Sequence, residues 1–160
     1  MIKRVKGLIN NQKGLTLVEL LAVIVILGII AAIAVPSIGK IIDNSKKDAH
    51  LANAQQMISA AKLAVAANEE DAKTPLGETK NISLEKLQLA GYLDEFTDPD
   101  SSAPYSKDKS FVEITNNNGK YTYTVTLVGS KRTINNKKAS ELNRDSIGNT
   151  SSTSPTAVTP

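Results

Sequence analysis

The sequence contains no cysteine, and this absence limits both its chemistry and the ways in which it can be stabilised. Disulfide bonds, thiolate metal sites and catalytic thiols are excluded. The chain also has a single histidine, His50, so a site with several histidine ligands is excluded and a histidine-containing catalytic triad would depend on this residue alone. His50 lies in a helical stretch rich in Ala, Lys and Asp, which predicts a solvated surface histidine.

Motifs of the common enzyme classes are missing as well. The sequence has no glycine-rich phosphate loop, no G-x-S-x-G nucleophile motif and no paired-histidine zinc motif. We therefore expect a protein that is not an enzyme and that carries no cofactor.

The positive charge of the chain is concentrated at its N-terminus. The 160 residues include 19 Lys and Arg against 16 Asp and Glu, which gives a formal charge of +3. Four of the cations precede residue 14, and without them the remainder has 15 basic residues against 16 acidic ones. A globally basic nucleic-acid surface is therefore not indicated for the rest of the chain.

The N-terminal cations are followed by a long apolar run. Residues 15–35 contain only two polar side chains, Thr16 and Glu19. A helix of this length spans about 30 Å, the thickness of the hydrocarbon core of a bilayer. The basic flank places the N-terminus in the cytoplasm, and the residues after Pro36 are expected outside. An ordinary cleaved signal peptide is the alternative, but its apolar core would be only about 7 to 15 residues long.

Glu19 is unusual in this setting, because a carboxylate in a bilayer costs about 2.5 to 3.5 kcal/mol and usually has a partner. No Lys, Arg or His lies between Leu15 and Gly39. Cleavage after Gly14 would create a cationic α-amino group at Leu15, one helical turn from Glu19. Between helices, this pair would fix the stagger of one subunit on the next. The alternative is that Glu19 lies near the headgroups and extends outward to water.

The segment Lys-Gly-Leu-Thr-Leu-Val-Glu-Leu, residues 13–20, resembles the prepilin cleavage motif of type IV pilins and pseudopilins. The resemblance implies cleavage between Gly14 and Leu15 by a prepilin peptidase, with methylation of the new terminus at Leu15. It assigns the family's assembly glutamate to Glu19 and its helix-kinking proline to Pro36. The family usually has phenylalanine where this chain has Leu15, and the close resemblance covers about residues 7–40.

This resemblance implies a structural subunit of a type IV pilus, similar to a major pilin and assembled through its N-terminal helix. Its partners would be other copies in a helical filament, the prepilin peptidase, the pilus assembly machinery and, before assembly, membrane lipid. The subunit would begin as a single-pass protein of the cytoplasmic membrane and end in an extracellular pilus, where cell adhesion is one family role. The alternatives are a pseudopilin of a type II secretion or DNA-uptake apparatus, and a signal-anchored monomeric surface-binding protein.

The pattern along the chain predicts an α+β fold, with a long N-terminal helix packed on a small antiparallel sheet. We expect a cleaved basic leader (1–14), a transmembrane and filament-core helix (15–36), its amphipathic continuation (37–69), a head (70–134) and a flexible Ser/Thr-rich tail (135–160). Pro36 is expected to kink or loosen the helix between Gly28 and Pro36. The apolar positions assigned to the amphipathic face are Ile38, Ile41, Ile42, Ala49, Ala52, Met57, Ala60, Ala61, Ala64 and Val65.

Within the head, Ser83 is expected to cap a short helix that ends before Gly91. Strands are predicted over residues 111–115 and 121–128, joined around Asn118-Gly119, and a third near residues 131–134. Residues 97–109 are expected to form a loop. The core is predicted to include Leu84, Leu87, Leu89, Tyr92 and Leu93.

Two charged segments are candidates for binding. Asp98, Asp100 and Asp108 crowd the predicted loop and could hold calcium, and Asp98-Pro99 resembles the start of the calcium loop of type II secretion pseudopilins, but the rest of that motif is absent, which favours a solvated turn. A basic stretch could contact nucleic acid or an acidic surface, but few aromatic residues accompany it, which favours a solvated edge. Its cations are Lys131, Arg132, Lys137, Lys138 and Arg144.

Overall fold

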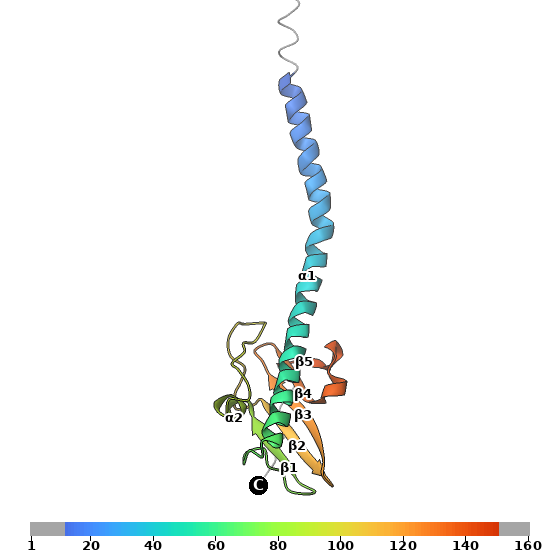
Figure 1. The fold of residues 1–160 in the computed structure, drawn as a ribbon. Helices are drawn as coiled ribbons and strands as arrows, with labels where there is room; N and C mark the ends of the chain where they lie inside the picture. The colour runs from blue at the N-terminus through green and yellow to red at the C-terminus, as the bar shows by residue number, and fades with distance from the viewer. Residues whose placement is uncertain (1–11, 151–160) are drawn as a thin grey trace, which may run out of the picture. The chain divides into compact units, whose positions relative to one another are not determined.

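One long helix, α1, runs from Gln12 to Ala66 in the computed structural model (Figure 1). The structure describes the backbone of residues 12–150 and the side chains from Thr16 onward. The amphipathic part of the helix was expected to reach residue 69, but α1 ends at Ala66, and Asn68 just beyond it takes a left-handed φ of 58°. The chain divides into two units, residues 1–43 and residues 44–160.

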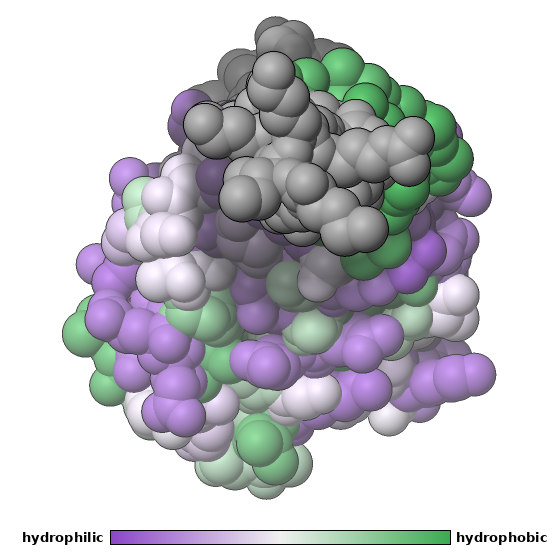
Figure 2. Space-filling view, turned by 90° about the horizontal axis from the view of Figure 1, so that it is seen from above, coloured by the Kyte–Doolittle hydropathy of each residue, from purple (hydrophilic) through white to green (hydrophobic). Residues whose placement is uncertain are grey.

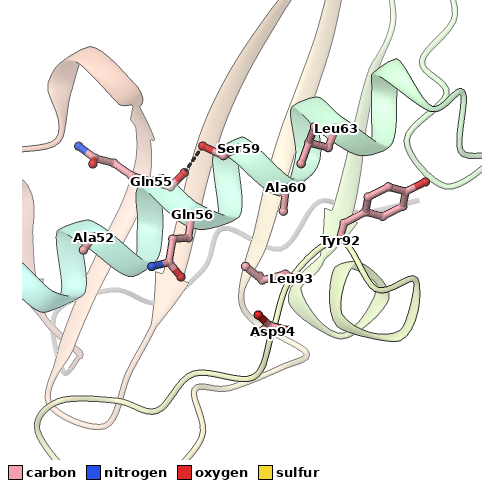
Figure 3. A pocket seen from close by; sticks show the side chains of 9 residues that line it. All are labelled: Ala52, Gln55, Gln56, Ser59, Ala60, Leu63, Tyr92, Leu93 and Asp94. Atoms are coloured by element: carbon pink, nitrogen blue, oxygen red, sulfur yellow. Dashed lines mark hydrogen bonds between the residues drawn. The ribbon is translucent and has the colours of Figure 1, made fainter.

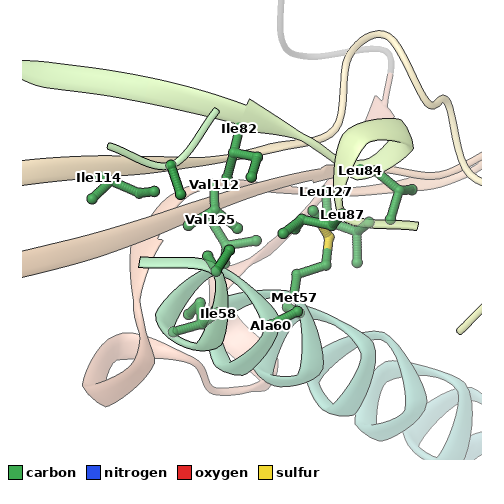
Figure 4. Packing of buried hydrophobic residues seen from close by; sticks show 14 of the residues in the cluster. Met57, Ile58, Ala60, Ile82, Leu84, Leu87, Val112, Ile114, Val125 and Leu127 are labelled. Atoms are coloured by element: carbon green, nitrogen blue, oxygen red, sulfur yellow. The ribbon is translucent and has the colours of Figure 1, made fainter. Parts of the chain in front are cut away.

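The second half of α1 supplies one wall of the hydrophobic core. Ala54, Met57, Ile58 and Ala61 are each no more than 2% exposed, and Figure 4 shows this face of the helix packed against the sheet. Ala54 and Ala61 allow the backbones of helix and sheet to approach closely. The longer side chains of Met57 and Ile58 fill the space between them. The expected amphipathic helix is therefore confirmed in this half of α1.

The sheet opposite α1 has five antiparallel strands in the order β1-β2-β3-β4-β5. In β2 the buried residues alternate with half-buried ones, as one covered face of an antiparallel sheet requires. The α+β prediction is thus confirmed. The strands are β1 (Thr79–Ser83), β2 (Phe111–Asn117), β3 (Lys120–Val128), β4 (Arg132–Lys138) and β5 (Ile147–Asn149).

The turn between β2 and β3 is the one that the sequence predicts. Asn118 and Gly119 have φ values of 52° and 84°, and Asn117 pairs with Lys120. Positive φ at both central residues is the geometry of a tight hairpin turn whose twist matches that of the strands. The predicted loop is also confirmed, since it contains no strand or helix beyond an isolated bridge between Thr97 and Pro104.

The short helix α2 spans Leu84–Leu89 and has the predicted ends. The side-chain oxygen of Ser83 accepts a hydrogen bond from the Lys86 amide at 3.2 Å, and Gly91 follows the helix with a φ of 76°. Leu84 and Leu87 are buried, as expected, but Leu89 is 81% exposed. Its assignment to the core is wrong, because a helix of little more than one turn buries a single face.

The expected flexible tail is also wrong for its first part. Residues 135–138 continue β4, the 3-10 turns η2 (Ala139–Glu141) and η3 (Arg144–Ser146) follow, and β5 pairs with β4. Leu142 and Ile147 pack against the core. These two apolar side chains anchor the segment, although most of its residues are polar. Residues 151–160 lie outside the described part of the chain.

Candidate functional site

The first half of α1 presents a continuous apolar surface. Its large apolar side chains from Leu17 to Ile42 are 47–70% exposed, and Figure 2 shows hydrophobic residues gathered in a band at the surface. Within the described residues, α1 is the one helix long and apolar enough to cross a membrane. An apolar surface of this size is not stable in water, so it requires lipid or other protein chains around it.

The apolar surface extends beyond the predicted membrane segment. Ile38, Ile41 and Ile42, which the sequence assigns to the amphipathic face of the helix, are 51–66% exposed. They follow one another at helical spacing, and the first buried residue among the described side chains of α1 is His50. These three residues therefore extend the exposed apolar surface that lipid or other protein chains must cover.

Glu19 is an exposed carboxylate within this apolar surface. Gly14 and Leu15 lie in the helical backbone that begins at Gln12, but the side chain of Leu15 lies outside the description, as do residues 1–11 of the predicted leader. Cleavage after Gly14, methylation of Leu15 and the pairing of Glu19 with the new terminus thus stay predictions.

Pro36 lies inside α1, and the helix continues on both sides of it. Proline has no amide proton, so it removes the hydrogen bond to the carbonyl four residues earlier, at Ala32. The hydroxyl of Ser37 donates a hydrogen bond to the Ile33 carbonyl at 3.1 Å, which gives a neighbouring carbonyl a second donor. The missing hydrogen bond is a local reason to expect a looser helical turn at Pro36, although α1 continues unbroken through it.

The second unit contains a buried polar network that the sequence did not predict. His50 is only 2% exposed, so its assignment to the surface is wrong. Tyr105 Oη lies 2.7 Å from His50 Nδ1, and His50 Nε2 lies 3.1 Å from Asp100 Oδ2 and 3.4 Å from Asp98 Oδ1. The Asn53 amide donates to Tyr105 Oη at 3.1 Å. The network joins α1 to the loop of residues 97–109.

A neutral imidazole satisfies this whole chain of hydrogen bonds. Asn53 donates to the Tyr105 oxygen, the Tyr105 hydroxyl donates to Nδ1, and the Nε2 proton is donated to Asp100. Burial, reinforced by the nearby Asp98 and Asp100, raises the pKa of Tyr105 and keeps its hydroxyl a donor. Each group in the network thus donates or accepts a hydrogen bond as its chemistry allows.

The carboxylates of the network are balanced by cations. Arg132 Nη1 lies 3.2 Å from Asp100 Oδ1, and Lys46 Nζ lies 3.8 Å from the same oxygen. Burial opposes the charge of Asp98, but hydrogen bonds donated by Ser130 and by the Asp100 amide outweigh it and hold the pKa of Asp98 below its ordinary value. Two carboxylates and two cations leave the cluster without net charge when the imidazole is neutral.

This arrangement does not fit a calcium ion. His50, Asp98 and Asp100 do bring one possible ligand atom each within 4.8 Å of one another. Calcium, however, takes six to eight oxygen ligands, whereas one ligand here is an imidazole and Arg132 and Lys46 already neutralise Asp100. The predicted calcium candidate Asp108 is exposed and is not a member of this group. Asp98 and Asp100 thus serve the packing of the loop.

Two cations of the basic stretch form ion pairs. Arg132 belongs to the buried network, and Arg144 Nε and Nη2 donate to the two oxygens of Asp48 at 2.7 and 2.6 Å. The Arg144 guanidinium lowers the pKa of Asp48. Lys131 and Lys138 remain as exposed cations on the β4 side of the sheet.

The chain is similar to known proteins, both in its N-terminal helix and over most of its length. A family profile described as "Prokaryotic N-terminal methylation motif" matches residues 9–35. The chain is 36% identical over 121 residues to "Type IV major alpha-pilin" of Moraxella bovis, an alignment that covers 74% of this chain and 70% of that protein. It is 41% identical over 81 residues to "Fimbrial protein Q" of the same organism, covering 50% and 49%. No solved structure matches with significance.

Proposed function

The chain belongs to the type IV pilin family, and from this we propose that it is the repeating structural subunit of an extracellular pilus held together by α1. The observation that carries the proposal is the exposed apolar surface from Leu17 to Ile42, which a free subunit in water could not keep. Before assembly, lipid covers this surface. In the filament, the α1 helices of neighbouring copies cover it.

Proteolytic removal of the leader allows the same helix to lie first in lipid and then in the filament. A prepilin peptidase cuts the peptide bond between Gly14 and Leu15, the leader is lost, and Leu15 becomes the methylated N-terminus. The new amino group is cationic near neutral pH and lies about one helical turn from Glu19. In the filament, Glu19 of one copy takes the terminus of another copy as its counter-ion, which sets the axial stagger between them.

The family membership supports a membrane-anchored precursor whose head reaches the outside. The apolar helix supports the anchoring, and the basic residues before it favour a cytoplasmic N-terminus. The role is structural, and the conversion from anchor to filament needs no chemistry from the head.

The proposal is tested on material sheared from cells that express the chain. Electron microscopy should show thin filaments, and mass spectrometry should identify this chain as their main protein, starting at methylated Leu15. A chain that stays in the membrane fraction as a monomer, or a mature chain that still begins at Met1, would contradict the proposal.

A further inference from the structure

Two faces of the head that the proposed function leaves unused have complementary character. The first, here called the acidic-apolar face, consists of Leu63, Leu89, Leu93, Glu85 and Asp94. Leu89 is 81% exposed and Leu63 is 59% exposed. Figure 3 shows Leu63, Leu93 and Asp94 around a groove between α1 and the segment after α2, and an adjoining groove contains Glu85, Leu89 and again Leu93 and Asp94. Lys107 also borders the adjoining groove but pairs with Glu95 at 3.1 Å, so Glu85 and Asp94 give this face its acidic character. Exposed leucines with a polar rim are typical of a protein-binding surface.

The second, here called the basic-aromatic face, consists of Lys62, Tyr121, Tyr123 and Lys138. The two tyrosine rings lie side by side with centroids 6.5 Å apart, and Lys62 Nζ lies 5.7 Å from the centroid of Tyr123. These residues border one groove, and no carboxylate is among the described residues that line it. Tyrosine supplies a large rigid contact area with a polar tip, and it is common at the centre of protein interfaces.

The two faces lie on opposite sides of the C-terminal part of α1. Leu63 and Gln56 border the acidic-apolar face, whereas Ile58 and Lys62 border the basic-aromatic face. Figure 1 shows α2 on one side of this part of α1 and β3 and β4 on the other. When two different faces of a subunit bind each other, each contact leaves one face of each kind open. Such a contact can repeat from copy to copy, and it gives an open helical filament when the rotation between copies does not close a ring.

We propose that the acidic-apolar face of one copy docks on the basic-aromatic face of the next copy. Glu85 and Asp94 meet Lys62 and Lys138, while Leu89 and Leu93 cover the tyrosine rings. Complementary charge selects the partner and the orientation, and the apolar contact supplies most of the affinity. The proposal rests on the proposed filament, to which it adds a lateral contact between heads.

The absence of cysteine allows a direct test by cross-linking in sheared filaments. Leu89→Cys and Ser140→Cys place one thiol beside each face, since Ser140 is exposed and borders the basic-aromatic groove. A short bis-maleimide should join chains that carry both substitutions into a ladder of dimers, trimers and longer products. Each single variant alone should remain monomeric on denaturing gels. Dimers from a single variant would show that like faces meet, and no ladder from intact double-variant filaments would also overturn the proposal.

Charge exchange provides a second readout on the full chain. Asp94→Lys should lower the yield of sheared filaments about tenfold, because it opposes Lys62 across the contact. The pair Asp94→Lys with Lys62→Glu should restore it, whereas Lys62→Glu alone should not assemble well. If all three variants assemble like the parent, the docking is wrong and the filament stands. If the parent forms no filaments, the proposed function fails instead. A labelled oligonucleotide that binds parent filaments and is lost with Lys62→Glu, without cross-linking between faces, would assign the basic-aromatic face to nucleic acid and overturn the docking.

Discussion

Tyr105 Oη lies 2.7 Å from Nδ1 of His50, and this contact ties the loop of residues 97–109 to α1. The two residues are 55 positions apart in the chain, and both are buried. Because the chain contains no cysteine, no disulfide can hold this loop to the helix, and packing and hydrogen bonds must do so.

Removing the Tyr105 hydroxyl should destabilise the head. Tyr105→Phe leaves His50 Nδ1 and the Asn53 amide without this partner, and we expect a loss of about 1 to 2 kcal/mol in the free energy of unfolding. His50→Phe should cost more, about 2 to 3 kcal/mol, because it takes a donor from buried Asp100. Urea unfolding of the detergent-solubilised chain, followed by circular dichroism, measures both. Tyr121→Phe is the comparison, because the Tyr121 hydroxyl accepts one longer hydrogen bond, from the Asn116 amide at 3.4 Å, and its loss should cost less. Equal effects at Tyr105 and Tyr121 would refute the network.

Asp98 should make the head sensitive to acid. Its folded-state pKa is lowered, so its contribution to stability is present above the ordinary value of about 4 and is lost as the pH falls through the folded-state pKa. Asp98→Asn should therefore flatten the dependence of unfolding free energy on pH below about pH 4. Asp108→Asn, at an exposed position, should leave the slope as it is. A slope that Asp98→Asn does not change would contradict this assignment.

The sequence predicted those elements whose signals are local. The apolar run, the Asn118-Gly119 turn and the Ser83 cap each depend on a few neighbouring residues, and all three lie where they were expected. The strand β1 was missed because Ile82 is the single apolar residue among its five, and its place is fixed by pairing with β2.

The buried network could not be predicted because no part of the sequence encodes it locally. His50 and Asp100 are 50 positions apart, and each looks like a surface residue among its neighbours. Only the packing of α1 against the loop places the imidazole beside two carboxylates and supplies Arg132 from β4 as counter-ion. A composition-based reading assigns such residues to solvent, since burial of charge is rare without a partner.

Two glycines should respond differently to substitution. A Cβ at Gly129 would lie 2.9 Å from Asp98 Oδ2 and 3.0 Å from the Arg132 carbonyl oxygen, so Gly129→Ala should cost about 1 to 3 kcal/mol through crowding. Gly119→Ala meets no atom within 4 Å but must take a φ of 84°, at a cost of about 1 kcal/mol. Asparagine, which tolerates positive φ, should be accepted at Gly119 and rejected at Gly129. Thermal unfolding of the four variants checks this, and tolerance of Gly129→Asn would show that the loop can yield.

Pro36 should control the local opening of α1. Pro36→Ala restores an amide that can bond the Ala32 carbonyl, and it removes a residue that costs a helix interior about 3 kcal/mol. In detergent micelles, amide hydrogen exchange around residues 32–37 should slow by at least tenfold. Ser37→Ala, which removes only the bond to the Ile33 carbonyl, should change exchange little. Equal exchange in the parent and Pro36→Ala chains would show that proline does not loosen this turn.

Glu19 should be needed for assembly and not for insertion. Glu19→Leu removes the charge that costs about 2.5 to 3.5 kcal/mol in a bilayer, so the precursor should enter the membrane at least as well as the parent. Filament yield should nevertheless fall below a tenth, because the cationic N-terminus of a neighbouring copy loses its partner. Thr16→Val, which removes a neutral polar group from the same segment, separates charge from polarity and should leave the yield near that of the parent. Membrane fractionation measures insertion and shearing measures assembly, so a Glu19→Leu chain that inserts and still assembles at full yield would place the basis of stagger elsewhere on α1.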